Sequence, residues 1–134
     1  MPTIQSHYPG DLRTEATHVA SGNTLITDAP LDNQGKGEAF SPSDLVCAAL
    51  CSCMITIMGI AASKRGIALE GLQADITKFM VSDPRRISKI EIRFYNFPAS
   101  LNEDQRAILE RAAKTCPVAL SLHPDIKQEI TFEF

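Results

Sequence analysis

The sequence has no tryptophan, no basic cluster and no apolar leader. Its thirteen lysine and arginine residues are scattered, and sixteen acidic residues outnumber them, which gives a net charge of -3. This balance provides no basic surface for nucleic acid or for an anionic membrane. The first residues contain neither the basic segment nor the apolar run of a secretory signal. We therefore expect a cytoplasmic protein without a nucleic-acid or membrane partner.

The chain also lacks internal repeats, low-complexity tracts and linker-like segments. It has 134 residues, of which 44% are hydrophobic and 22% charged, and these values are ordinary for one soluble globular domain. We expect a single domain over residues 1–134.

The four cysteines do not have the dispersed spacing of a disulfide scaffold. Cys47, Cys51 and Cys53 lie within seven residues, and Cys116 stands far from them in the sequence. In a reducing compartment, cysteines are more often buried, catalytic or metal-binding than disulfide-bonded. Each cysteine therefore has to be judged by the element that carries it.

The pattern of apolar and turn residues predicts an α+β fold. Alternating or β-branched segments bounded by turn residues suit two hairpins and a last strand. These segments are residues 11–19, 24–29, 72–80, 90–94 and 126–134. Residues 30–40 contain two glycines and a proline without any period, which predicts a loop.

Three helices are expected between these strands. Ser41 as N-cap with Asp44 in a capping box begins the first helix, and Gly66 ends it after about 24 residues. A capping box of Ser100 and Glu103 opens a second helix that stops near Lys114. A short third helix begins at Cys116-Pro117 and ends before His123-Pro124.

The first of these helices has no charged residue from Leu45 to Ala62, and it is apolar or small on every side. A sheet in a domain of this size covers one side of a helix, so the other side needs a second helix. Its own symmetry mate is the simplest choice, and small residues such as Gly59 would allow a close approach. We therefore expect a homodimer, and we prefer it to a membrane span because polar residues and three cysteines dilute the segment.

Helical geometry separates the three clustered cysteines. At 100° per residue Cys47 and Cys51 share a face, whereas Cys53 lies about 160° from Cys51. For Cys47 and Cys51 the expected role is that of small buried hydrophobes. Zinc needs convergent ligands, and this spacing on one helix points the thiols apart, so we expect no metal site.

Cys53 and Cys116 together suggest a redox pair. Cys116 precedes a helix N-terminus, where free N–H groups and the helix dipole favour a thiolate and can lower its pKa. A two-cysteine peroxidase needs one thiolate to attack a peroxide and a second thiol to condense with the sulfenic acid. The pair fits this chemistry if the fold brings the two thiols together.

At this point the chain resembles the OsmC/Ohr family of osmotic-stress and organic-hydroperoxide proteins. The resemblance rests on Ser41-Pro42-Ser43-Asp44-Leu45, which leads to Cys53-Met54, and on Cys116-Pro117-Val118. It implies the OsmC-like fold, with β-hairpins packed around a long central helix in an intertwined homodimer. Sequences of this shape look closer to the less characterised OsmC-like branch.

By the same resemblance, Cys53 resembles the peroxidatic or otherwise reactive cysteine, and Cys116 resembles its resolving partner, with the sites at the subunit interface. The resemblance implies reduction of organic hydroperoxides in oxidative or osmotic stress defence, with hydrogen peroxide as a second candidate substrate. It implies no cofactor and no metal, and electrons from small dithiols or lipoylated proteins.

The family's peroxidases also carry an arginine from the N-terminal strand and a glutamate directly after the helix-start proline. Arg13 matches the arginine, but Ser43 stands at the glutamate position. Asp44 and Glu38 are the possible carboxylates that would orient Arg13 instead, and capping is the simpler role for Asp44.

Two alternatives to a peroxidase stay open. One is a non-catalytic OsmC-like binding protein that holds an apolar or thiol ligand at the dimer interface, which the absent glutamate favours. The other is a dimeric scaffold in which all four thiols are inert.

Overall fold

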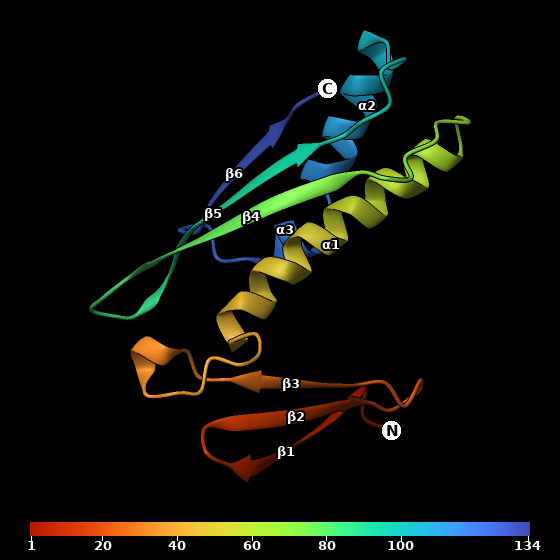
Figure 1. Ribbon diagram of the computed structural model, residues 1–134. Helices are drawn as coiled ribbons and strands as arrows, with labels where there is room; N and C mark the ends of the chain where they lie inside the picture. Colours follow the sequence, from red (N-terminus) through yellow and green to blue (C-terminus); the bar gives the residue numbers. More distant parts are fainter. The chain divides into compact units, whose positions relative to one another are not determined.

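The computed structural model describes all residues, 1–134, and has an α+β fold with two three-stranded sheets. Figure 1 labels its elements, which are β1 (Ile4–Gly10), β2 (Arg13–His18), β3 (Thr24–Asp28), η1 (Leu31–Asn33), α1 (Pro42–Ser63), β4 (Gln73–Val81), β5 (Arg86–Tyr95), α2 (Glu103–Lys114), α3 (Pro117–Ser121) and β6 (Lys127–Phe132). The chain forms two compact units, Met1–Val46 and Cys47–Phe134. The expectation that they make one domain stays a prediction.

The first unit contains the antiparallel sheet β1-β2-β3. The predicted hairpin is present as β2 and β3, and the register places Arg13 directly opposite Asp28. Strand β1 was not predicted, because Ile4–Gly10 has no apolar alternation and all but its last residue are exposed. It lies at the edge of the sheet with an irregular register before Gly10, where the proline at position 9 removes no central ladder bond.

The predicted loop after β3 folds back on its own beginning. The backbone N–H groups of Gly35 and Gly37 donate to the carbonyls of Pro30 and Ala29, at 2.9 and 3.2 Å. A Cβ on Gly35 would lie 1.8 Å from the Ala29 carbonyl oxygen, so no other residue fits there without a shift of the backbone. This closed loop brings Glu38 back to the end of β3.

Helix α1 has the predicted start and end. The Asp44 N–H donates to Ser41 Oγ at 3.1 Å, and the Ser41 N–H donates to Asp44 Oδ2 at 3.0 Å, which is the capping box. At the other end the guanidinium of Arg65 donates to the Ala61 carbonyl, and Gly66 adopts the left-handed conformation with φ +67°. These contacts satisfy carbonyl groups that the helix leaves unpaired.

The second unit is built on the sheet β4-β5-β6. Strands β4 and β5 form the predicted antiparallel hairpin, and β6 pairs with β5 in parallel. A parallel pair needs a crossover, which α2 and α3 supply. Figure 1 shows α1 and α2 on one side of this sheet. The core between them contains Leu50, Met54 and Met58 of α1, together with Ile90, Ile92 and Phe94 of β5 and Leu109 of α2, all at most 1% exposed.

The predicted cap of α2 was wrong. Asn102 is the N-cap, its side chain accepts the Gln105 N–H at 2.8 Å, and Gln105 returns a bond to the Asn102 N–H at 3.0 Å. The same type of capping box therefore forms two residues after the predicted Ser100. The predicted end near Lys114 is confirmed.

Only one stripe of α1 is buried within a single chain. The buried residues recur at helical spacing, whereas Ala49, Ser52, Thr56 and Ile60 on another face are exposed. By length and composition alone α1 could also cross a membrane, but the core helix of a soluble protein meets the same criterion. The structure thus leaves an uncharged face of α1, with small and hydroxyl side chains, exposed in the single chain.

Candidate functional site

Cys116 is the N-cap of α3, as its position before Pro117 predicts. Its Sγ atom accepts the Ala119 N–H with an N–S distance of 3.4 Å, and its side chain is fully buried. Pro117 at the first helical position lacks an N–H that would otherwise need a partner. The thiol is therefore held in one place by the start of the helix.

The Cys53 side chain, from the middle of α1, packs against the core cluster that contains Cys116, and its presence raises the pKa of the Cys116 thiol. A raised pKa means that the neighbouring Cys53 favours the protonated form of Cys116. Cys53 is partly exposed, while Cys116 is buried, and both thiols are free. The fold therefore brings together the two cysteines that the sequence suggested as a pair.

The helix start lowers the pKa of Cys116 as expected, but other contributions outweigh it. Burial is the largest contribution and raises the pKa, the N–H groups of Ala119 and Val118 lower it, and the Cys53 thiol raises it further. The net direction is upward from the usual value. Cys116 is thus a neutral thiol at pH 7, suited to react after its partner.

Cys47 and Cys51 are buried, as their shared helical face predicts. Burial alone raises the pKa of Cys51 to about 11. A thiol with this pKa is almost entirely protonated at neutral pH, and it is correspondingly inert.

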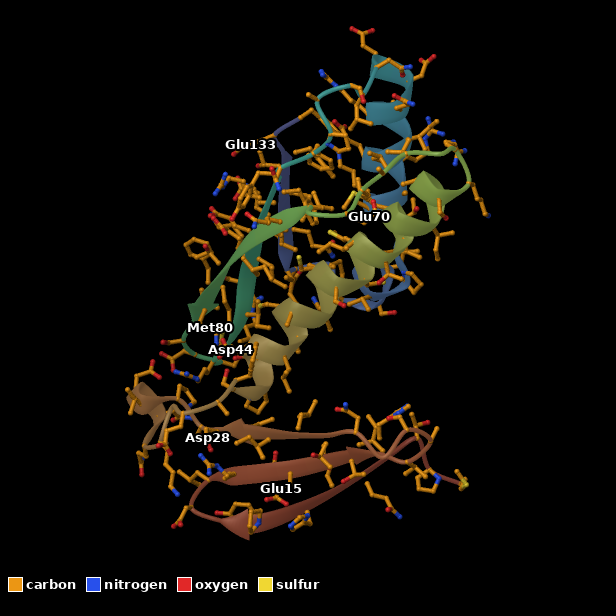
Figure 2. All side chains as sticks on the ribbon, turned by 45° about the vertical axis from the view of Figure 1, so that its right-hand side comes forward. Glu15, Asp28, Asp44, Glu70, Met80 and Glu133 are labelled. Carbon is orange, nitrogen blue, oxygen red and sulfur yellow. The ribbon has the colours of Figure 1, made fainter.

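In the first unit, Arg13 forms a cluster with two carboxylates. Its Nε and Nη2 atoms donate to Oδ1 and Oδ2 of Asp28 at 2.7 and 2.8 Å, and Nη2 also contacts Glu38 Oε1 at 3.2 Å. The hydrogen bonds from Arg13 hold the pKa of Asp28 below its ordinary value, although burial opposes this shift. Asp28 is therefore ionised at neutral pH, and Figure 2 labels it at the end of β3.

The two predicted carboxylates have different positions. Glu38 contacts Arg13, whereas the described bonds of the Asp44 carboxylate are those of the α1 capping box. Asp28 was missed by sequence reasoning. The observed register pairs Thr17 with Thr24, so the turn is centred before the predicted residues 21–23, and a hairpin built on the predicted turn would not have placed Asp28 opposite Arg13.

The structure defines the fold class, which is α+β with two three-stranded sheets and one long helix that is uncharged from Leu45 to Ala62. The chain belongs to the OsmC-like family, because the family model for "OsmC-like protein" matches residues 35–131. A comparison with curated proteins gave no match.

Solved structures agree with this assignment. A Psychrobacter arcticus 273-4 protein, described as an osmotic stress induced and detoxification response protein, is 50% identical with a TM-score of 0.95, over 99% of this chain and 96% of that one. The organic hydroperoxide resistance protein OsmC of Legionella pneumophila has the same fold at 15% identity and a TM-score of 0.72, over 98% and 95% of the two chains. An OsmC-like protein of Mycoplasma pneumoniae, also 15% identical, has a TM-score of 0.79 over 97% and 94%.

Proposed function

We propose that this protein is a thiol-dependent peroxidase that reduces organic hydroperoxides through Cys53 and Cys116. The observation that carries the proposal is the packing of Cys53 against the core cluster that contains Cys116, with Cys53 partly exposed, Cys116 buried and both thiols free. Organic hydroperoxide resistance is part of the description of some structural neighbours, including the Legionella pneumophila protein. Hydrogen peroxide is a second substrate to test.

The chemistry balances with one dithiol per peroxide. The Cys53 thiolate attacks the O–O bond of ROOH, a sulfur–oxygen bond forms, and the alkoxide leaves with a proton as ROH. Cys116 then attacks the sulfenic sulfur, so that a disulfide forms and water leaves. A small dithiol or a lipoylated protein restores both thiols by exchange.

The order of the two cysteines follows from their environments. Cys53 is partly exposed and therefore reachable from solvent, which suits the attacking group. Cys116 has a raised pKa and is buried, which suits a thiol that must not react first.

Arg13 would help to hold the peroxide, and a homodimer would supply the interface on which the site lies. The exposed, uncharged face of α1 supports the dimer. The first unit supports it also, because its buried residues Thr27, Asp28 and Ser41 are all polar, so it has no apolar core of its own. We place this enzyme in the cytoplasm, in oxidative or osmotic stress defence.

The first test is oxidation of the reduced protein by one equivalent of cumene hydroperoxide, with hydrogen peroxide in parallel. We expect rapid loss of two thiols and a Cys53–Cys116 disulfide in the peptide map. Cys53→Ser should consume peroxide at least a hundredfold more slowly, and Cys116→Ser should stop at a sulfenic acid on Cys53. Wild-type rates in Cys53→Ser would rule out the peroxidase.

The second candidate is a non-catalytic binding protein that holds an apolar or thiol ligand at the dimer interface. Ser43 favours it, since it stands where the resemblance implies a glutamate. Four thiols that stay free after minutes with peroxide would support this candidate.

A further inference from the structure

We propose that Asp28 is the positioning residue for Arg13. In this chain it would orient the guanidinium, the role that the resemblance gives to the helix-start glutamate of the family's peroxidases. The proposal rests on the proposed peroxidase function. It assigns Asp28 no contact with peroxide, because its role is to fix the guanidinium that makes that contact.

Arg13 and Asp28 form a bidentate ion pair. The Nε and Nη2 atoms of Arg13 donate to Oδ1 and Oδ2 of Asp28, and both nitrogen–oxygen distances are below 2.9 Å. A bidentate arginine–carboxylate pair fixes orientation as well as distance. None of the bonds to Asp28 or Glu38 uses Nη1, so this nitrogen can donate to a peroxide oxygen.

The backbone reinforces this arrangement. Arg13 and Asp28 are opposite each other in the β2–β3 register, so their side chains leave the same face of the sheet. The Asp28 N–H donates to the Phe40 carbonyl at 3.1 Å, and Asp28 Oδ2 accepts the Glu38 N–H at 3.1 Å. The carboxylate is therefore held by the strand, by the closed loop and by Arg13.

Burial distinguishes Asp28 from Glu38. The Asp28 side chain is 0% exposed, whereas that of Glu38 is 65% exposed and makes a single, longer contact at 3.2 Å. An exposed, monodentate contact is worth little and is easily lost to solvent. We therefore assign the positioning role to Asp28. Glu38 adds only an exposed negative charge beside Arg13.

The test compares Asp28→Asn with Arg13→Gln and with the double variant. Asp28→Asn should lower the second-order rate constant of Cys53 oxidation by cumene hydroperoxide by about tenfold or more, because the guanidinium loses its fixed orientation. Arg13→Gln should lower it at least as much. If Asp28 acts only through Arg13, the double variant is no slower than Arg13→Gln.

Asp75→Asn is the matched control. Asp75 faces Arg93 in the β4–β5 register with an oxygen–nitrogen distance of 2.6 Å, so it is also a cross-strand aspartate–arginine pair. This variant should oxidise at the wild-type rate. Alkylation of Cys53 by neutral iodoacetamide should stay within about twofold of wild type in Asp28→Asn, which separates peroxide binding from a general change in the thiol.

The exchanged variant Arg13→Asp with Asp28→Arg covers the case in which Asp28→Asn does not fold. It restores the ion pair but moves the guanidinium to β3, so it should fold and oxidise slowly. Wild-type peroxide rates in a folded Asp28→Asn or in the exchanged variant would overturn the proposal, as would a double variant slower than Arg13→Gln. A fully active Arg13→Gln with an inactive Cys53→Ser would reject the role of Asp28 and leave the peroxidase intact.

Discussion

At the scale of single residues, the environment decides what each thiol can do. Cys51 and Cys53 are two positions apart on α1, yet Cys51 faces the core and Cys53 faces Cys116. The angular spacing of the sequence predicts this division, because helical geometry is regular. The pKa of Cys116 could not be predicted, since the sequence shows that a helix begins there but not how deeply the thiol is buried.

Cys51 gives a test of this difference. With a pKa of about 11, its thiolate fraction at pH 8 is roughly a hundredfold smaller than that of an ordinary thiol. We therefore expect iodoacetamide to label Cys51 in the folded protein at least a hundredfold more slowly than in urea. The rate should rise about tenfold per pH unit up to the pKa. Peptide mapping by mass spectrometry between pH 7 and 10 measures it, and equal rates in the two states would contradict the burial of Cys51.

Asp28 shows a limit of reasoning from motifs. The search for a carboxylate near Arg13 followed the family's helix-start position, where Ser43 stands, and so it reached Asp44 and Glu38. The partner that makes the bidentate contact lies fifteen residues from Arg13, on the neighbouring strand. Only strand register connects these two positions.

At the scale of elements, helix starts were easy to find and harder to assign to one residue. Ser41 with Asp44 is present as predicted, because the motif is followed at once by an apolar helix. Before α2, two overlapping motifs were available, and the sequence does not decide between Ser100 and Asn102. Strand β1 was missed for a related reason, since an edge strand with two polar faces carries no hydrophobic period.

The capping choice can be tested by two alanine substitutions. Asn102→Ala removes the side chain that accepts the Gln105 N–H, and it should lower the free energy of unfolding by about 1 kcal/mol. Ser100→Ala should change it by less than about 0.5 kcal/mol, since Ser100 is exposed and outside the cap. Urea denaturation of both variants gives the comparison, and a larger loss in Ser100→Ala would contradict the assigned cap.

At the scale of the whole molecule, the two sheets and three helices follow the predicted order apart from β1 and the short η1 turn. The homodimer stays a prediction. It rests on the uncharged surface of α1, which the sequence already shows. The structure adds which part of that surface the single chain buries.

A substitution at Gly59 tests whether a second helix covers the exposed part of the α1 surface. A Cβ on Gly59 would meet nothing within 4 Å in the single chain, so Gly59→Ala should stabilise an uncovered helix by about 1 kcal/mol. In the dimer that we propose, the added methyl group falls where two helices approach closely. We expect a lower melting temperature and weaker association by sedimentation. A melting temperature that rises, independent of protein concentration, would contradict a close helix pair.

The parallel crossover between β5 and β6 would give the proposed Cys53–Cys116 redox pair an effect on stability as well. Cys116 lies inside this crossover, far along the chain from Cys53, so the thiols meet only after α2 and α3 have packed. A disulfide between them would close a loop of roughly 60 residues and, through the lost chain entropy of the unfolded state, stabilise the fold by about 4 kcal/mol. Each catalytic cycle would then alternate between a looser and a tighter protein, and the oxidised form would be the one that survives heat and proteases until a reductant arrives.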